Sequence, residues 1–203
     1  MIPTLVLIVE GHGEVEAAPL LIRRLVLAID PQRQVRLPPP IRVKRDRFIR
    51  QEQEFTRTVE LAALKVVERG AILILLDADE DCPAERGPEL LERARCCRPD
   101  RHLSVVLANR EFESWFLAGA RSLRSFRGLP EDLSPPEKPE QIRGAKEWLD
   151  RRMVDCRYRE TRDQAALVSR LDLEAAEAAP SFRRLRREIE RLLVEMDREP
   201  RGT

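Results

Sequence analysis

The chain alternates between short, mostly apolar runs and longer segments in which apolar residues recur every three or four positions. The apolar runs are Thr4–Val9, Ala71–Leu76 and Leu103–Ala108. A short continuous apolar run is typical of a strand that is buried on both faces of a parallel sheet. The helical periodicity predicts helices over residues 14–29, 51–69, 89–97 and 111–120.

A further strand is only weakly indicated. Residues 35–43 contain extended, partly apolar sequence, but three consecutive prolines, Pro38 to Pro40, restrict it to a sheet edge or an irregular segment. Strands and helices therefore alternate over the first 120 residues. This alternation predicts an α/β fold with a mostly parallel sheet, right-handed crossovers and helices on its faces.

The last third of the chain shows helical patterns only. It follows a proline-rich loop at residues 124–139, which is the one clear break in composition. We therefore predict an α/β core over residues 1–122 and a helical C-terminal extension, residues 123–203, that packs on the core. Its predicted helices cover residues 141–152, 162–171 and 182–196.

Acidic residues follow the predicted strands at their carboxyl ends. Glu10 follows the first strand, and Asp77, Asp79 and Asp81 follow the strand that starts at residue 71. Alternate residues of an extended chain point to the same side, so we expect Asp77 and Asp79 to face one volume. The third strand is followed by Asn109 and then by two glutamates. Of these, Glu113 is the better candidate for the same site, because residues two apart on a helix point in different directions.

These carboxylates are expected to lie close together, because ligands bind where the carboxyl ends of parallel strands meet. Several carboxylates in one place repel each other unless cations neutralise them. Oxygen ligands favour Mg²⁺, with Mn²⁺ or Ca²⁺ as alternatives, over Zn²⁺. Two such ions can promote phosphoryl transfer. The alternative interpretation of the Asp77–Asp81 stretch is an acidic turn that caps the next helix.

The loop after the first strand, Gly11-His12-Gly13, is not a phosphate-binding P-loop, because no Gly-Lys-Ser/Thr follows it. The glycines permit a tight turn from strand to helix. Glu14 opens the predicted helix, where the helix dipole favours an acid, so it is either a site residue or a helix-terminus charge. His12 could contact a phosphate or carry a proton, or it could be an exposed bystander.

The motifs VEGHGEVEAAPLLIRRL, ILLDADEDCP and NREFESWFLA, in this order, resemble the Toprim domain, which occurs in primases, topoisomerases and OLD-family nucleases. Together with YRETRDQ at residues 158–164 and APSFRRL at residues 179–185, they resemble a Toprim-like bacterial family of unknown function, DUF4276. The resemblance covers almost the whole chain and implies a Toprim-like, Rossmann-like fold.

The resemblance also implies roles for individual residues. Glu10 would be a general acid or base or a metal ligand, and Asp77 with Asp79 would hold a divalent cation. The OLD type implies further ligands at Glu14 and Glu113. Because Asp81 extends the motif to DxDxD, the pair that binds the metal is left open.

The overall charge does not decide the partner. Lys and Arg number 37 and Asp and Glu number 36, for a net charge of +1, so only local clusters of charge are informative. The basic run Arg42–Arg50 and the last helix, with Arg183 and Arg187, could contact a phosphate backbone. Lys146 could also reach a phosphate, although a solvated helix face is the favoured interpretation for it.

We therefore expect a Mg²⁺-dependent enzyme, most simply a nuclease that cleaves DNA or RNA in phage defence or repair. Catalysis itself is left open. The alternatives are a non-catalytic partner of an ATPase, since the chain has no Walker motif, and a nucleotidyl transferase or nucleotide hydrolase. No apolar run approaches the length of a membrane span, so we expect a cytoplasmic protein without a membrane partner. A homodimer is left open.

Overall fold

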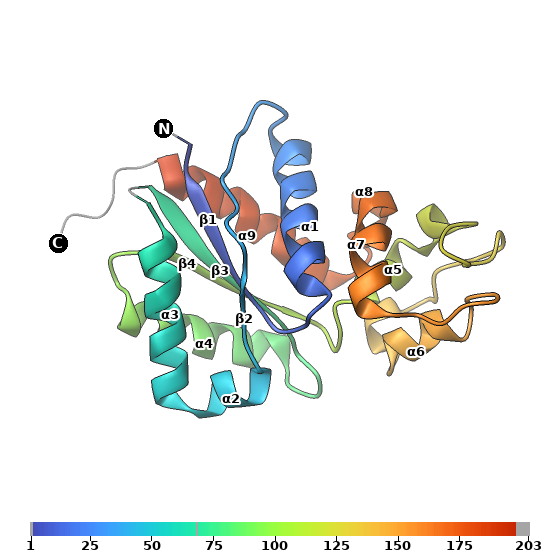
Figure 1. Cartoon of the computed structure of the whole chain (residues 1–203), viewed down its shortest axis with the longest axis horizontal. Helices are drawn as coiled ribbons and strands as arrows, with labels where there is room; N and C mark the ends of the chain where they lie inside the picture. Colours follow the sequence, from blue (N-terminus) through green and yellow to red (C-terminus); the bar gives the residue numbers. More distant parts are fainter. Residues whose placement is uncertain (1, 68, 198–203) are drawn as a thin grey trace.

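The computed structural model describes residues 2–67 and 69–197, and within them one four-stranded sheet has the order β2-β1-β3-β4 with every neighbouring pair parallel (Figure 1). The strands are β1 (Thr4–Val9), β2 (Ile41–Arg42), β3 (Gly70–Asp77) and β4 (His102–Ala108). The predicted α/β class is confirmed, and the parallel sheet with helices on both faces is Rossmann-like.

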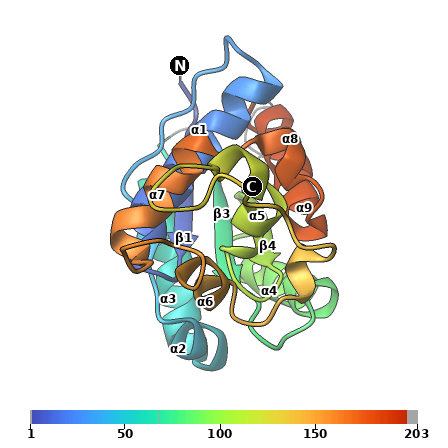
Figure 2. The same ribbon diagram turned by 90° about the vertical axis from the view of Figure 1, so that its right-hand side faces the viewer.

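Helices cover both faces of the sheet (Figures 1 and 2). One face is covered by α1 (Glu14–Ile29) and α9 (Pro180–Asp197). The other is covered by α2 (Arg45–Arg50), α3 (Glu52–Lys65) and α4 (Pro83–Cys97). The remaining helical segments gather beyond the carboxyl ends of the strands. They are α5 (Ser114–Ala118), η1 (Ala120–Leu123), η2 (Pro139–Gln141), α6 (Ala145–Asp150), α7 (Glu160–Arg170) and α8 (Leu173–Ala176).

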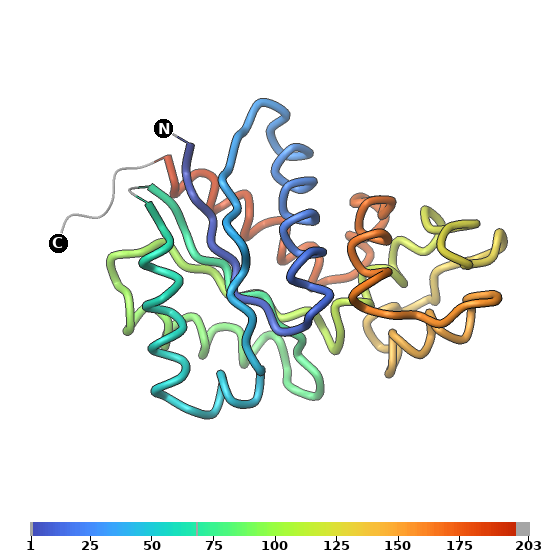
Figure 3. Tube along the Cα trace, viewed as in Figure 1, coloured from blue at the N-terminus to red at the C-terminus, as the bar shows by residue number. Residues whose placement is uncertain are grey.

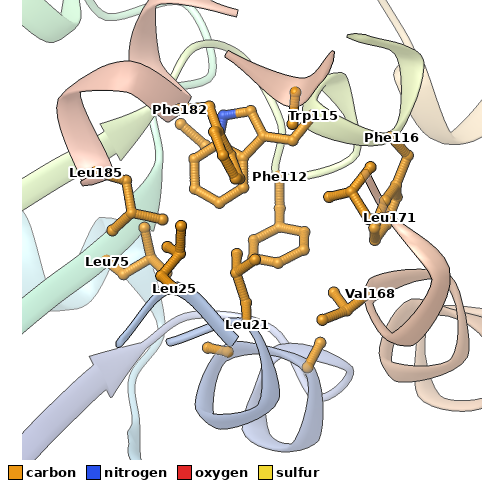
Figure 4. Packing of buried hydrophobic residues seen from close by; sticks show 14 of the residues in the cluster. Leu21, Leu25, Leu75, Phe112, Trp115, Phe116, Val168, Leu171, Phe182 and Leu185 are labelled. Carbon is orange, nitrogen blue, oxygen red and sulfur yellow. The ribbon is translucent and has the colours of Figure 1, made fainter. Parts of the chain in front are cut away.

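The alternation of side chains along each strand separates two apolar cores. Leu73 and Leu75 face α1 and α9, whereas Ile74 faces α3 and α4. In the larger core, Leu75 lies beside Leu25 of α1, and residues of α5, α7 and α9 pack around them (Figure 4). The helices of the C-terminal third therefore share one continuous core with the sheet. The predicted division at residue 122 stays a prediction.

Several boundaries differ from the predicted ones. The second strand is reduced to two residues and a single bridge between Thr4 and Arg36, because the prolines that follow residue 37 cannot continue the ladder. The trace in Figure 3 shows this long return from α1 to β2 beside β1. The basic run contains the short helix α2, and α4 starts at Pro83, six residues early, since proline suits a first helical position.

The helix predicted over residues 51–69 ends at Lys65, and position 68 lies outside the described residues. Gly70 opens β3 directly afterwards. A side chain at Gly70 would lie 2.0 Å from the carbonyl oxygen of Thr4 on β1, so only glycine allows the two strands to approach at this point. Among the helices described, none is long and apolar enough to cross a bilayer.

Candidate functional site

The strand register places three polar strand ends at one edge of the sheet. Val9 pairs with Leu75, and Asp77 pairs with Ala108. Glu10, Asp77 and Asn109 therefore leave β1, β3 and β4 side by side. The charge of Glu10 raises the pKa of Asp77, and the backbone of Asp77 helps to stabilise the Glu10 carboxylate, so the two acids are electrostatic neighbours.

Glu14 is the first residue of α1 and is 3 % exposed. Its Oε2 accepts the backbone N–H of Glu10 at 3.2 Å, which folds the loop back over the end of β1. Gly13 has ordinary helical φ and ψ angles, so the turn does not require glycine there. A side chain at Gly13 would instead lie 2.4 Å from Gln164 Oε1, so glycine lets α1 approach α7 closely.

Glu113 is fully buried and comes from the segment between β4 and α5. Its Oε1 accepts hydrogen bonds from the Tyr158 hydroxyl at 2.8 Å and from Gln164 Nε2 at 2.9 Å. Its Oε2 has no hydrogen-bond partner among the described residues. The sequence indicated the region of Tyr158 and Gln164 only through the YRETRDQ likeness. It did not indicate that they bind Glu113.

Asp77 ends β3 and is 7 % exposed. The backbone N–H of Phe112 donates to its Oδ1 at 2.7 Å, which connects β3 to the segment that carries Glu113. Phe112 itself is buried in the core with Trp115 and Phe116. These aromatic rings belong to the core that the site packs against, and they have no exposed face that could stack against a base.

Four carboxyl groups at this edge have raised pKa values. Burial is the largest cause for each of them. Burial raises the pKa of Glu14 to about 7. It also raises the pKa of Glu113 to about 7, although Lys146 and the Tyr158 hydroxyl oppose this second shift. Burial and the charges of Glu14 and Glu113 raise the pKa of Asp77 well above its usual range. Burial and then Asp79 raise the pKa of Glu10. The ionised forms of these four acids are therefore disfavoured at this edge, chiefly because the groups are buried.

Lys146, at the start of α6, is the cation on this side of the cluster. Its Nζ lies 2.8 Å from Glu160 Oε1, and its side chain is 33 % exposed. Burial alone would lower its pKa, but Glu113, Glu160 and Asp77 raise the pKa above its usual value. The favoured interpretation of Lys146 as part of a solvated helix face is therefore replaced by a partly buried position beside the acids.

Arg45 on α2 organises the loop after β3, a role that the sequence did not reveal beyond a basic run. Its guanidinium donates to the carbonyl oxygens of Asp77 at 2.8 Å and Ala78 at 2.9 Å, and it also binds the Asp81 carboxylate. It forms an ion pair with Asp79 at 3.3 Å. The DxDxD segment is thus fastened to α2 through one buried side chain.

The three aspartates of this motif do not share one orientation. Asp79 has a φ of 51° and a side chain that is 57 % exposed, so the strand alternation ends at Asp77 and the two do not share one orientation. Asp79 still lies close enough to Glu10 to raise its pKa. Asp81 is held by Arg45 and lies 3.4 Å from Arg86 Nε, away from the buried acids.

The weaker candidates for phosphate contact lie on the surface. His12 is exposed in the loop between β1 and α1. Arg183 and Arg187 are exposed on α9, and the Arg183 guanidinium donates to the carbonyl oxygen of Glu177. The structure brings Glu10, Glu14, Asp77 and Glu113 together, with Asp79 near Glu10, and leaves Asp81 apart. It leaves these three basic side chains outside that group.

Residues 9–190 match the family described as a domain of unknown function, DUF4276. The chain belongs to this family. The matched range starts at the end of β1 and ends within α9, so it contains all four buried or half-buried acids. Neither a curated protein nor a solved structure matches the chain. A relationship of this DUF4276 protein to Toprim domains stays a prediction.

The donor atoms of the DUF4276 site suit an oxygen-preferring cation. Glu10 Oε2 and Glu113 Oε2 are both buried without a hydrogen-bond partner, and a buried acceptor of this kind is costly unless a cation or donor satisfies it. Among the described residues, the distances between the acids do not form a complete metal-binding group. Within residues 2–67 and 69–197, no three His, Cys, Asp or Glu side chains are close enough together to form a metal-binding group.

The raised pKa values predict how the metal-free DUF4276 protein responds to pH. Glu14 and Glu113 have an ordinary pKa of 4.5 when unfolded and about 7 when folded, so the folded state binds more protons between these values. The free energy of unfolding should therefore fall as the pH rises from about 4.5 to about 7, by a few kcal/mol in all, and change little above that.

This expectation is checked by urea unfolding in EDTA between pH 5 and pH 8. Glu113→Gln should flatten the slope, because it removes one titrating group, whereas Glu16→Gln at an exposed position of the same first turn as Glu14 should leave it unchanged. A free energy of unfolding that rises across this range would show that the acids are not held in a proton-binding state.

Proposed function

We propose that this DUF4276 protein is a Mg²⁺-dependent enzyme that cleaves phosphodiester bonds of DNA or RNA, with Mn²⁺ as an alternative cation. One observation carries the proposal. Carboxylates from the ends of β1 and β3, the start of α1 and the segment after β4 lie at one edge of the sheet, and two of their buried oxygens have no hydrogen-bond donor within the part of the chain that the structure describes. A Toprim-like relationship would be consistent with this arrangement.

Binding of a divalent cation would relieve the electrostatic cost of this arrangement. Burial raises the pKa values of Glu14 and Glu113 to about 7, and repulsion by neighbouring acids adds to the shift of Glu14. Lys146 supplies only part of the compensating charge. Carboxylate oxygens are the ligands that Mg²⁺ and Mn²⁺ prefer. We assign Glu10, Asp77 and Glu113 as the main candidate ligands, with Glu14 and Asp79 beside them.

The other residues of the site have supporting roles. A bound cation would lower the pKa of a water molecule and stabilise negative charge on a phosphate. Glu10 is only half-buried, so its carboxylate can accept a proton from a water that enters from solvent. Tyr158 and Gln164 orient Glu113, and Lys146 is placed to balance the charge of a phosphate that reaches the acids.

A basic surface that an anionic polymer could contact lies next to this site. The N-terminus of α2 follows β2 at the same edge of the sheet, and its surroundings expose Arg42, Lys44, Arg47 and Arg50. Arg47 lies 3.2 Å from Glu54, so part of this charge is balanced, but the segment as a whole is basic. Such a segment favours contact with a phosphate backbone.

The proposal is tested by two measurements on the same purified protein. Labelled single- and double-stranded DNA and RNA should be cleaved in MgCl₂ or MnCl₂ and left intact in EDTA. Calorimetry should show uptake of Mn²⁺ that competes with proton binding, and hence is stronger at pH 8 than at pH 5. Absence of Mn²⁺ uptake at pH 8 would exclude the cation site. Uptake without cleavage of any of the four substrates would exclude the nuclease assignment.

A further inference from the structure

The outer edge of β4 carries backbone groups that pair with no described residue. In a parallel ladder only alternate residues of a strand bond to a given neighbour. The outward set is identified at both ends, since the N–H of Asn109 donates to a serine of α9 at 3.2 Å and the carbonyl of Leu103 accepts from an arginine of α9 at 2.9 Å. The backbone N–H and carbonyl groups of Val105 and Leu107 point outward in the same way. Neither residue makes a backbone hydrogen bond outside the ladder with β3.

This edge is the floor of an apolar groove of about 510 Å³ between α4 and α9. Figures 1 and 2 show β4 lying between these two helices. One wall comes from α4 and the other from the first turns of α9. The wall residues that matter here are Ala84, Gly87 and Leu91 of α4 and Pro180 and Arg184 of α9.

Gly87 keeps the groove wide. It lies within α4, where glycine is less stable than alanine. A Cβ at this position would meet no atom within 4 Å, so no neighbouring side chain or backbone of the described residues requires glycine there. The space that the missing side chain leaves open belongs to the groove.

The spacing of the free backbone groups matches an extended peptide. Val105 and Leu107 are two residues apart, which is about 6.6 Å along a strand. Each has one outward donor and one outward acceptor at the floor of the groove, where the two residues are 4 % and 3 % exposed. A planar heterocyclic ligand would pair with the donor and acceptor of one of these residues, whereas an extended peptide pairs with those of both. A second folded copy is excluded from the groove, because helices α4 and α9 flank its own β4 and would meet those of the first copy before the strands could pair.

The charge at the start of β4 indicates which kind of residue lies next to the apolar residues of a bound peptide. A smaller hollow of about 370 Å³ lies at the start of β4 and includes Arg95. Two further arginines of its lining are balanced by acids of the same hollow, because Arg101 pairs with Asp100 and Arg191 pairs with Glu195. Arg95 is exposed, lines this smaller hollow and has no acidic partner among the described residues. An acidic side chain next to the bound segment would complement it.

We infer that the β4 edge groove binds an extended apolar segment of a partner protein, about three to four residues long and flanked by an acidic residue, which adds a strand to the sheet beside Val105 and Leu107. This inference does not depend on the proposed phosphodiester cleavage. The groove opens on the side of β4 and uses none of the acids assigned to the cation.

The first test selects linear seven-residue peptides from a phage library on the full chain and removes those that also bind Gly87→Leu. Leucine at this position should fill the groove, while the variant unfolds at a urea concentration no lower than the wild type. Selected peptides should alternate apolar residues beside an acid and should bind the wild type at least tenfold more tightly than Gly87→Leu. Glu89→Leu, exposed on another side of α4, should bind them like the wild type.

The second test uses the tightest selected peptide after N-methylation of its two central amides, which removes backbone donors and keeps every side chain. Its affinity by fluorescence anisotropy should fall at least tenfold, and Arg95→Ala should weaken the unmodified peptide several-fold. Equal affinity of the N-methylated peptide, or a library that yields no peptide discriminating against Gly87→Leu, would overturn the inference. So would light scattering that shows a wild-type dimer and a Gly87→Leu monomer.

Discussion

Replacing Asp77 by asparagine is expected to lower the rate of cation-dependent cleavage by at least about a hundredfold. Loss of a residue that only supports a metal ligand costs up to about a hundredfold, and Asp77 is assigned as a ligand itself. Asparagine keeps an oxygen at the place where Asp77 Oδ1 accepts the Phe112 N–H at 2.7 Å, so the local backbone should be preserved. It removes the negative charge that a divalent cation needs. The measurement is the initial rate of cleavage at saturating MgCl₂ and MnCl₂.

The same variant should be slightly more stable than the wild type when metal is absent. Asp77 is buried beside Glu14 and Glu113, whose charges raise its pKa, so a neutral side chain relieves repulsion. Mn²⁺ should then raise the unfolding temperature of the wild type at pH 8 but not that of Asp77→Asn. Unchanged cleavage by both Asp77→Asn and Glu10→Gln would reject the assigned site, whereas loss of activity together with loss of folding would point to a structural role for Asp77.

Replacing Arg45 by methionine is expected to lower the free energy of unfolding by about 2–4 kcal/mol. This is somewhat less than a fully buried ion pair would cost, because Asp79 and Asp81 are partly exposed to water. The carbonyl oxygens of Asp77 and Ala78 would lose donors at 2.8 and 2.9 Å, and methionine cannot replace them.

Urea unfolding at pH 7 measures this loss, and Arg47→Met is the matched control. Arg47 lies two residues further along α2, but its side chain is 59 % exposed and pairs with Glu54 on the surface. Its replacement should change the free energy of unfolding by less than about 0.5 kcal/mol. Similar losses for the two variants would mean that Arg45 contributes only surface charge and does not hold the loop after β3.

The strands were predictable because their signal is local. Thr4–Val9 and the run from Ala71 to Leu76 are apolar without a break, and the structure confirms both strands nearly to the residue. The acids at the strand ends were predictable for a related reason. Parallel pairing places all carboxyl ends at one edge, so Glu10 and Asp77 follow from strand order alone.

The residues that hold these acids were not predictable. Arg45 reads as one member of a basic run, and Lys146 reads as one polar position on a short helix. The role of Arg45 comes from contacts with residues more than thirty positions away, such as its bond to Asp77. The position of Lys146 depends on its ion pair with Glu160 of another helix. Nor did the pattern indicate that Asp79 would adopt a positive φ, which ends the alternation on which its predicted orientation depended.

The two hydrogen bonds to Glu113 have a consequence for synthesis of the protein. The donors, Tyr158 and Gln164, lie 45 and 51 residues after the carboxylate that they orient. A chain still being translated can form β1, β3 and β4 before either donor has left the ribosome. The hydrogen bonds that orient Glu113 are therefore completed only after residue 164 has been synthesised and has emerged.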